Sequence, residues 1–504
     1  MSFFTLQFAA LLAAALIFYY ALPKKCGWVV LLAVSLAFYA WGGVKTIFYL
    51  LFTAGTTYAS GLILGRFNRR DADEGKVRAA RKKLTVAACV LLNFSVLFAV
   101  KYWDQAAGLF SLPRLSLVLP LGLSFYTFAS IGYVIDCYRG KQSPEKNPLK
   151  YLLFVSFFPT VVQGPISRFG QLAPQFTAAE RSADNVKRGL QTAMWGCLKK
   201  LIVANRAAVV ADAVFANPEN YGGAFYAIGV LFYCIQLYCD FSGGIDVARG
   251  VALTFGIDLT ENFKRPIFAV SLADYWRRWH ITLGTWMRDY VFYPLSFSRP
   301  MGAISRFARK HVKGKAGKVI PTAAATFVVY LLIGIWHGSS LKYIFFGLYN
   351  GAIMTASVLL AGVYSSTRNK LKINEKGAPL HFFRLVRTMA IVFVGRYFTR
   401  APRLLAAFAM LGRTFTHPCL YQLTDGTALT FGLTAFDFAV IAAGVAVILA
   451  VEFFEERGAK ILDALDRKGA LVQFVFILIP LAIITAQAAF GGDAIDASSI
   501  YRQF

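Results

Sequence analysis

Residues 319–336 read VIPTAAATFVVYLLIGIW, a run without a charged side chain. A helix of roughly 20 apolar residues crosses the hydrocarbon core of a bilayer, and comparable runs recur along the whole chain. The sequence therefore predicts an all-α, polytopic membrane protein, with roughly 11–13 membrane segments in one transmembrane domain over residues 1–504. The expected segments lie near 3–22, 28–43, 46–65, 84–101, 117–136, 150–166, 190–215, 222–242, 319–336, 341–363, 383–399, 431–453 and 470–490.

The composition of the chain supports this assignment. The 504 residues are 57% hydrophobic and 16% charged, whereas soluble domains are about half apolar and a quarter charged. The net charge of +27 lies largely in the loops 66–83, 298–318 and 366–387, which we expect in the cytoplasm. No nucleic-acid-binding motif accompanies this charge, so membrane lipids are the expected partners and nucleic acid is not. The seven scattered cysteines form no CxxC pair, and we expect small buried side chains and no metal site.

One segment, residues 244–298, mixes charges and tryptophans at a density that a simple span does not tolerate. We expect short interfacial or re-entrant helices there, on the cytoplasmic side, and the same for 150–166 and 245–258. The motifs Gly61-x-x-x-Gly65 and Gly347-x-x-x-Gly351 indicate close packing of helices.

Two of the five histidines stand out, and the first is His337. It follows the apolar run and precedes Gly338, where the predicted helix breaks. An ionisable group at such depth is a functional candidate, and neutral imidazole can accept a proton from a hydroxyl. The alternative is a histidine that locks two helices together. Ordinary loop or helix-end positions are expected for His311, His381 and His417.

The second candidate, His280, ends the sequence YWRRWH at 275–280. In a continuous helix, Trp276, Trp279 and His280 approach one face while Arg277 and Arg278 project elsewhere. The arginines can bind phosphate or an acidic carrier surface, so these two arginines and two tryptophans are predicted to hold a donor. The alternative is that these arginines and tryptophans only anchor the segment at the level of the lipid headgroups. Substrate orientation, charge stabilisation and a structural role all stay open for His280.

Several carboxylates lie in or beside apolar runs: Asp136, Asp240, Asp246, Asp258 and Glu261. We expect structural ion pairs, with Arg277, Arg278 and Arg288 as partners, in preference to a proton relay. The chain has no GxSxG, Walker, HExxH or GxGxxG motif, so a serine hydrolase and a nucleotide-driven pump lack support.

Two long blocks, ENFKRPIFAVSLADYWRRWHITLGTWMRDYVFYPL (261–295) and LLIGIWHGSSLKYIFFGLYNG (331–351), resemble the membrane-bound O-acyltransferase family. The likeness is to a bacterial branch that contains alginate O-acetylases and teichoic-acid D-alanyl transferases. Further blocks at 119–140, 157–172 and 235–250 occur in the same order, so the resemblance spans nearly the whole chain.

This resemblance implies a ring of tilted helices around a central tunnel in the bacterial cytoplasmic membrane. It identifies His337 with the essential histidine of the W-H-G motif and His280 with the histidine of W-R-R-W-H. The implied donor is a cytoplasmic thioester, either acyl-coenzyme A (acetyl-coenzyme A) or an acyl-carrier protein, and no cofactor is bound permanently. The implied acceptor is an extracytoplasmic polysaccharide, reached with a partner protein. Positive charge on the cytoplasmic face would attract such a donor.

The alternatives to acetyl transfer are D-alanyl transfer, secondary transport and a non-catalytic scaffold. The block QGPISRFGQLAPQF (163–176) and the charged segment 244–298 favour acetyl over D-alanyl transfer. A secondary transporter would show paired broken helices in two related halves, and the sequence has one disrupted region and no repeat. A non-catalytic scaffold is disfavoured because both histidines are present. The family also tends to have an apolar aromatic residue where this chain has Arg396, which puts a lipid-facing role there in doubt.

Overall fold

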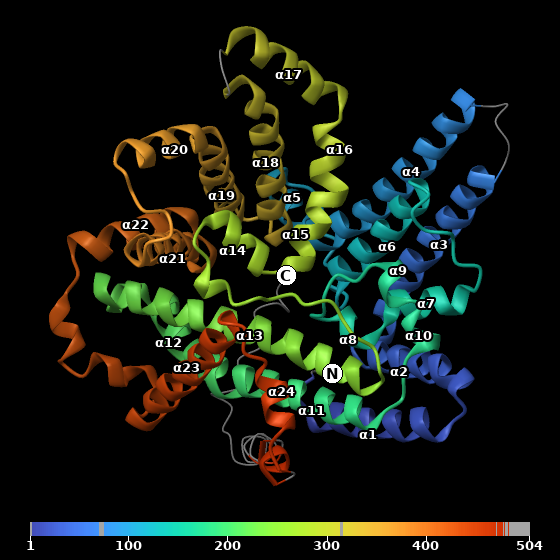
Figure 1. Cartoon of the computed structure of the whole chain (residues 1–504), viewed down its shortest axis with the longest axis horizontal. Coiled ribbons are helices and arrows are strands. Elements are labelled where there is room, and N and C mark those ends of the chain that lie inside the picture. Colours follow the sequence, from blue (N-terminus) through green and yellow to red (C-terminus); the bar gives the residue numbers. More distant parts are fainter. Residues whose placement is uncertain are drawn as a thin grey trace. The chain divides into compact units, whose positions relative to one another are not determined.

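The computed structural model describes residues 3–69, 75–312, 316–469, 471–476, 478 and 482. Within these ranges every regular element is a helix, and extended pairing is confined to an isolated bridge between Phe263 and Trp279 (Figure 1). The all-α prediction is confirmed. The chain forms two compact units, and helix α13 (Gly223–Thr254) contributes its residues up to 240 to the second unit and those from 241 to the first.

Long apolar helices confirm that the protein is polytopic. By length and composition, seven helices of the described residues can cross a membrane, and α19 (Leu341–Leu359) with α20 (Ala361–Lys370), bent by 55°, would make an eighth. The shorter apolar helix α1 (Leu6–Ala21) lies in the expected segment 3–22, whereas α22 (Leu404–Thr416) was not expected. The described residues thus hold fewer full-length spans than the 11–13 membrane segments that we expected. The predicted segment 470–490 lies mostly outside the described residues. The seven spans are Lys24–Trp41, Val44–Asn68, Gly75–Lys101, Gly223–Thr254, Gly317–His337, Ala378–Arg400 and Ala435–Glu456.

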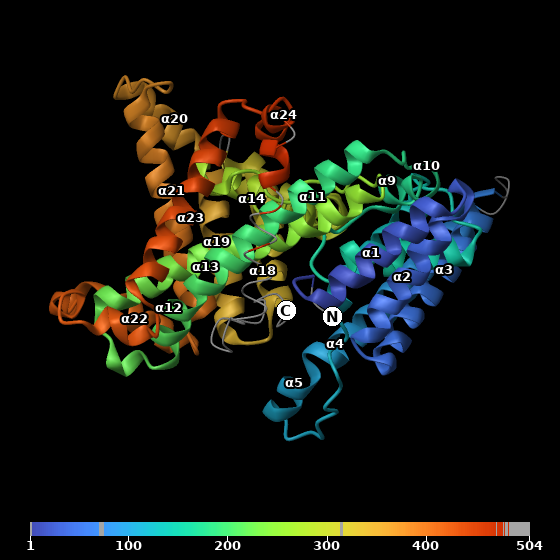
Figure 2. The ribbon, with the colours of Figure 1, turned by 90° about the horizontal axis from the view of Figure 1, so that it is seen from below.

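Of the described residues, the first unit comprises those within 3–198, 241–261 and 465–482. Figure 2 shows α1 and α2 side by side in blue. A core of aromatic rings joins α6, α7 and α9, with the Tyr133 and Tyr151 ring centroids 4.7 Å apart. Gly61 faces this core, since a Cβ there would lie 2.7 Å from the Tyr133 ring. The helices are α1, α2 (Gly27–Trp41), α3 (Ile47–Arg69), α4 (Gly75–Lys101), α5 (Trp103–Leu109), α6 (Leu123–Tyr138), α7 (Pro148–Ser156), α8 (Phe158–Val161), α9 (Phe169–Leu172), α10 (Gln175–Ala178) and α11 (Ala183–Cys197).

Several predicted boundaries in this unit are wrong. Helix α4 begins at Gly75 rather than 84, because its basic first turns are good helix formers. The segment 117–136 becomes helical at Leu123, and 150–166 consists of the short helices α7 and α8, as expected for a non-spanning segment. Residues 245–254 are not re-entrant but continue α13, because Gly250 packs closely on Gly189 of α11: a Cβ on Gly189 would come within 2.6 Å of the Gly250 carbonyl oxygen.

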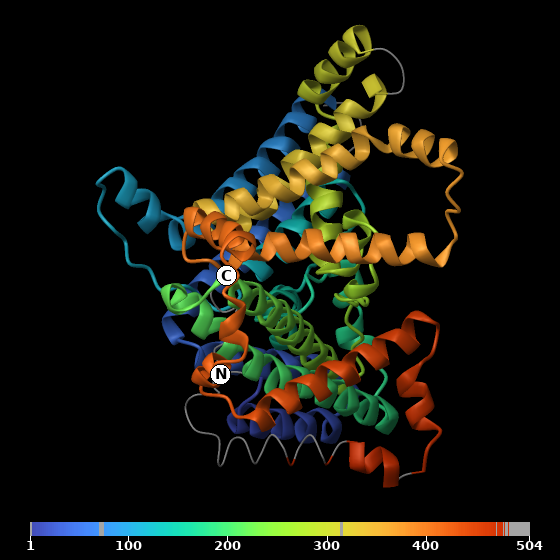
Figure 3. The ribbon, with the colours of Figure 1, turned by 90° about the vertical axis from the view of Figure 1, so that its left-hand side faces the viewer.

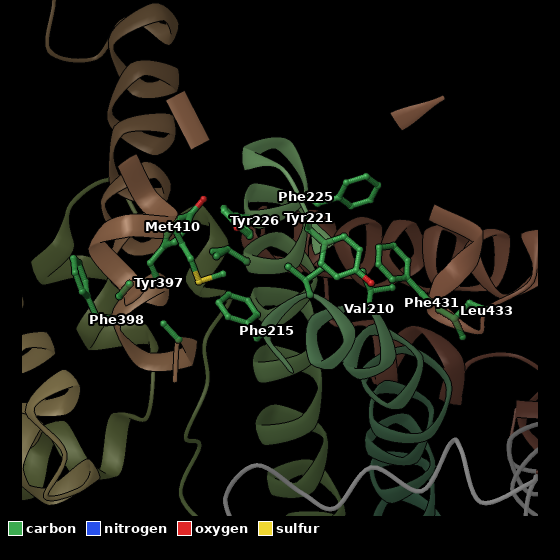
Figure 4. Close-up of a cluster of buried hydrophobic side chains, with 14 of the residues drawn as sticks. Val210, Phe215, Tyr221, Phe225, Tyr226, Tyr397, Phe398, Met410, Phe431 and Leu433 are labelled. Atoms are coloured by element: carbon green, nitrogen blue, oxygen red, sulfur yellow. The ribbon is translucent and has the colours of Figure 1, made fainter. Parts of the chain in front are cut away.

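Of the described residues, the second unit comprises those within 199–240 and 262–464. Figure 4 shows its hydrophobic core, in which Phe215, Phe225 and Tyr397 lie among side chains from α12, α13, α21 and α22. The remaining part of 244–298 consists of short helices, as predicted. The unit's helices are α12 (Asn205–Ala216), α14 (Leu272–Arg278), α15 (Ile281–Met287), the π-helical turn Arg288–Phe292, α16 (Tyr293–Ser296), α17 (Arg299–His311), α18 (Ala316–His337), α19, α20, α21 (Ala378–Arg400), α22 and α23 (Ala435–Glu456), and α24 (Ile461–Asp466) follows at its edge.

Helices α18 and α19 pack together as a hairpin, and this hairpin carries the candidate site. Figure 1 shows the two helices side by side. They approach so closely that a Cβ on Gly334 would lie 2.7 Å from the Cα of Gly347, and one on Gly351 would lie 3.2 Å from the Phe327 ring. The packing role predicted for the glycine motif is therefore confirmed. Figure 3 shows the chain turning back from α20 into α21, the long orange helix, which packs on α19.

One buried acid has a different partner from the one expected. The Oδ1 atom of Asp240 lies 2.7 Å from the Nζ atom of Lys200, on the π-helical segment Leu198–Ala204, and not beside an arginine of 277–288. The helical register of α13 and of this π-helical segment brings the two charges together. The structural ion pair is confirmed for Asp240, while its predicted partner is wrong.

Candidate active site

His337 is the last residue of α18 and is half-buried. The break after it depends on Gly338, where a Cβ would lie 2.6 Å from the ring of Tyr343. Because Gly338 has no side chain, Tyr343 can stack beside the imidazole, with 6.5 Å between centroids and 27° between planes. Phe346 meets His337 edge-on at 6.0 Å. The hairpin thus fixes the orientation of His337 at the end of a packed helix.

A small cavity lies beside His337. Its wall is mainly aromatic, and its polar groups include an imidazole, a guanidinium and the hydroxyls of Tyr233, Tyr343 and Thr399. Such convergent polar groups in an aromatic wall are typical of a small-molecule site. Of the predicted site residues, His337, Trp276 and Trp279 line it. The lining residues are Tyr233, Leu237, Trp276, Trp279, His337, Tyr343, Phe346, Arg396 and Thr399.

His280 is held by a segment far from it in sequence. Residues 262–264 run antiparallel to 278–281: the Lys264 amide donates to the Arg278 carbonyl oxygen at 2.9 Å, and the Ile281 amide donates to the Asn262 carbonyl oxygen at 3.0 Å. The predicted continuous helix is therefore wrong here. Helix α14 ends at Arg278, and His280 takes a left-handed conformation (φ 48°, ψ 53°) before α15 begins. This short antiparallel pairing stabilises a backbone conformation that residues other than glycine seldom adopt.

The hydrogen bonds around Asn262 define the protonation of His280. The Oδ1 atom of Asn262 accepts from the Thr282 amide and from the Thr282 hydroxyl, both at 2.9 Å. An atom that accepts from an amide is the carbonyl oxygen, so the Nδ1 atom of His280, 3.3 Å away, is the protonated nitrogen. Burial lowers the pKa of His280 to about 3. The ring is therefore neutral at ordinary pH, with its lone pair on Nε2.

The two histidines meet through one indole. The centroid of Trp336 lies 6.0 Å from that of His280 and 4.8 Å from that of His337. His280 is buried behind the cavity and does not line it. The half-buried His337 is therefore placed to exchange protons at the cavity. The buried, neutral His280 is fixed in orientation and supports the residues around it.

The two predicted donor-binding arginines do not line this cavity. Arg278 is held by Asp274 at 3.1 Å and by Glu456 at 2.9 Å, and Glu456 also binds Arg265 at 2.7 Å. Arg277 pairs with Asp274 at 3.3 Å, but its side chain is 70% exposed and available to a ligand. Their binding role stays a prediction, with Arg277 the better placed of the two.

Sequence reasoning missed four polar residues of this region: Asn262, Tyr233, Tyr343 and Thr399. It noted Arg396 only as a departure from a pattern. Arg396 is 6% exposed, donates from Nη2 to the Tyr275 hydroxyl at 2.8 Å, and stacks on Trp279 at 5.1 Å. A charge that interrupts the apolar run 388–395 of α21 was the available signal.

Comparison with known proteins shows the family of this chain. The sequence model of the membrane-bound O-acyltransferase family matches residues 142–372, which include both histidines. The probable alginate O-acetylase of Pseudomonas syringae pv. tomato is 31% identical over 452 residues, which cover 87% of this chain and 80% of that protein. This chain belongs to the membrane-bound O-acyltransferase family. It is a multi-pass membrane O-acyltransferase, and membership excludes the transporter alternative.

Two further relatives are named for acetyl transfer and for D-alanyl transfer. The peptidoglycan O-acetyltransferase of Helicobacter pylori is 30% identical over 361 residues, covering 65% of this chain and 63% of the relative. The teichoic acid D-alanyltransferase of Bacillus subtilis is 31% identical over 250 residues, covering 48% of this chain and 60% of the relative.

The neutral state of His280 gives a prediction for the pH dependence of this O-acyltransferase. In Asn262→Asp, a carboxylate faces Nδ1 and favours the imidazolium form, which raises the pKa of His280 above about 3 by about one to three units. Since the raised pKa means protonation at higher pH, the imidazolium form of His280 should appear at higher pH than in wild type. Nuclear magnetic resonance titration of the purified variant with labelled histidine measures this. A His280 signal that titrates as in wild type, in a folded variant, would contradict the neutral assignment.

Proposed function

We propose that this enzyme transfers an acetyl group from a thioester donor to a hydroxyl of an envelope or exported polysaccharide, with His337 as the general base. The observation that carries the proposal is the position of His337 in the wall of a mainly aromatic cavity, at the break between α18 and α19. The imidazole takes the hydroxyl proton, the hydroxyl oxygen forms the new C–O bond, and the C–S bond breaks. The proton then passes to the departing thiolate, so His337 is regenerated.

The protein's contribution to this step is chiefly alignment and proton transfer. A thioester already carries an activated acyl group, so holding it beside the acceptor hydroxyl supplies much of the rate. A general base adds on the order of 10²–10⁴-fold. The rings of Trp276, Trp279, Tyr343 and Phe346 exclude water from the cavity, which limits hydrolysis of the donor.

Acetyl-coenzyme A is the donor that we favour, and an acyl-carrier protein is the other thioester of this kind. Both carry phosphate or acidic groups, which the exposed Arg277 can bind. Arg278 keeps Arg277 and the end of α14 in place through Asp274 and Glu456. The acceptor class comes from the relatives that act on alginate and peptidoglycan, and such an acceptor implies an extracytoplasmic partner protein that presents or receives the acetyl group.

D-alanyl transfer to teichoic acid is the second candidate, supported by the similarity to the Bacillus subtilis enzyme. It is the weaker one because that similarity covers 48% of this chain, against 87% for the alginate acetylase.

The donor can be determined directly. The purified enzyme in lipid vesicles is given either radiolabelled acetyl-coenzyme A or a radiolabelled D-alanyl-carrier protein, and release of free thiol is followed with soluble polysaccharide as acceptor. We expect thiol release and label transfer with the acetyl donor. Transfer from the D-alanyl carrier alone would replace the proposal by the second candidate, and transfer from neither would contradict both.

A further inference from the structure

A second, larger cavity lies in the same unit. It has a volume of about 240 Å³ and is lined by apolar side chains of three candidate membrane spans, α13, α21 and α23. Leu231 and Ile235 come from the first of these, Val392 from the second and Ile448 from the third. A space of this size and polarity would accept a hydrocarbon chain far longer than the methyl group of an acetyl ester.

Two residues line both cavities, and they are Trp279 and Arg396. The Arg396 guanidinium carbon lies 5.1 Å from the Trp279 ring centroid and 6.0 Å from the Phe346 centroid, and its Nη2 atom donates to the Tyr275 hydroxyl. A guanidinium stacked between rings and tied at one end has little freedom to move. These two side chains therefore form a fixed wall, here called the partition, between the small cavity and the large one.

The partition has a consequence for the acyl group. An acyl chain that starts at His337 and extends beyond the small cavity meets Arg396 and Trp279 before it can reach the apolar space behind them. Crossing the wall would require displacement of a buried, hydrogen-bonded charge, which is energetically unfavourable. Without the wall, each further methylene would gain burial in the large cavity, a factor of roughly four in affinity per group.

We propose that the Arg396–Trp279 partition determines acyl-chain length and restricts this enzyme to short acyl groups. The proposal rests on the proposed function, because it takes His337 as the point of acyl transfer. It identifies Arg396 as a specificity-determining residue that the family pattern does not lead one to expect. It also explains how an enzyme with a large apolar cavity can still select a two-carbon substrate.

The test compares acetyl-, butyryl-, hexanoyl- and octanoyl-coenzyme A as donors for the full-length purified enzyme. In Arg396→Ala, the ratio of hexanoyl to acetyl transfer, each as kcat/KM, should rise on the order of 10–100-fold. In Tyr275→Phe, which removes the hydrogen bond that fixes Arg396 but keeps its side chain, the ratio should rise by less than in Arg396→Ala. An unchanged ratio in a folded Arg396→Ala enzyme would overturn the proposal.

A second pair of variants links the gain to the large cavity. Cys234 lines that cavity, so Arg396→Ala combined with Cys234→Phe refills the space and should return the ratio towards wild type. A gain that persists in the double variant would show that the chain goes elsewhere and would also overturn the proposal. If Arg396→Ala does not fold, Trp279→Leu opens the same wall and is judged by the same ratio. If wild type transfers acetyl and the wall variants leave the hexanoyl-to-acetyl ratio unchanged, only the partition is refuted. If wild type transfers no acyl group, the proposed function is refuted.

Discussion

Replacing His337 by alanine should lower acyl transfer on the order of 10²–10⁴-fold, with the protein still folded in the membrane. The loss has this size because the variant lacks the base that accepts the hydroxyl proton, while alignment by the cavity remains. Since the imidazole acts mainly in the transition state, the loss should fall on kcat more than on KM for the donor. Steady-state kinetics of the purified variant with the labelled acetyl donor provide the measurement.

A second histidine supplies the matched control. His311 is exposed at the end of α17, where its Nδ1 atom lies 2.9 Å from the Phe307 carbonyl oxygen, and it touches neither cavity. His311→Ala should retain the wild-type rate within about twofold, since exposed substitutions are usually near neutral. Equal activity of the two variants, at equal protein levels, would mean that His337 has a structural role and that the base lies elsewhere.

Replacing Lys200 by methionine should destabilise the protein by about 3–5 kcal/mol, because it leaves Asp240 as a buried charge without its counter-ion. The two side chains are 7% and 2% exposed, and their charged atoms lie 2.7 Å apart. Chemical unfolding of the detergent-purified variant, followed by tryptophan fluorescence, measures the loss. Activity should fall only in proportion to the folded fraction, since neither residue lines the cavity of His337.

Two comparisons isolate the effect of the buried charge. The double variant Lys200→Met with Asp240→Leu removes both charges and should regain most of the lost stability. Arg368→Met breaks a pair of similar length, 2.9 Å to Glu375, whose side chains are 32% and 53% exposed, and should change stability by about 0–1 kcal/mol. A Lys200→Met effect as small as that of Arg368→Met would show that water reaches Asp240.

Much of the fold could be predicted from the sequence because the length of each apolar run depends only on neighbouring residues. The run before His337 predicts a helix of the right extent, and the glycines of α19 predict its close approach to α18. Helix boundaries at polar ends were harder to predict. In α4, for example, basic side chains extend the helix beyond the membrane while its apolar part stays the same.

The candidate site was predicted less completely, for a physical reason. His337 and the two tryptophans were named from local signals, and the structure places all three at one cavity. The break before His280 was not predicted, because it arises from pairing with residues 262–264, a contact distant in sequence. The role of Asn262 depends on the same contact, and that of Arg396 depends on the packing of α21 against α14 and α19.

The central claim is that His337 drives acetylation of a cell-surface polysaccharide, and mass analysis of that polysaccharide tests it most directly. Cells that lack this protein are complemented with the wild-type protein or with His337→Ala at equal membrane levels. The ester-linked groups on the surface glycans are then identified and quantified by mass spectrometry. We predict acetyl esters with wild type and their near-complete loss with His337→Ala. Full acetylation in the His337→Ala cells, or loss of D-alanine with acetyl unchanged, would contradict this account.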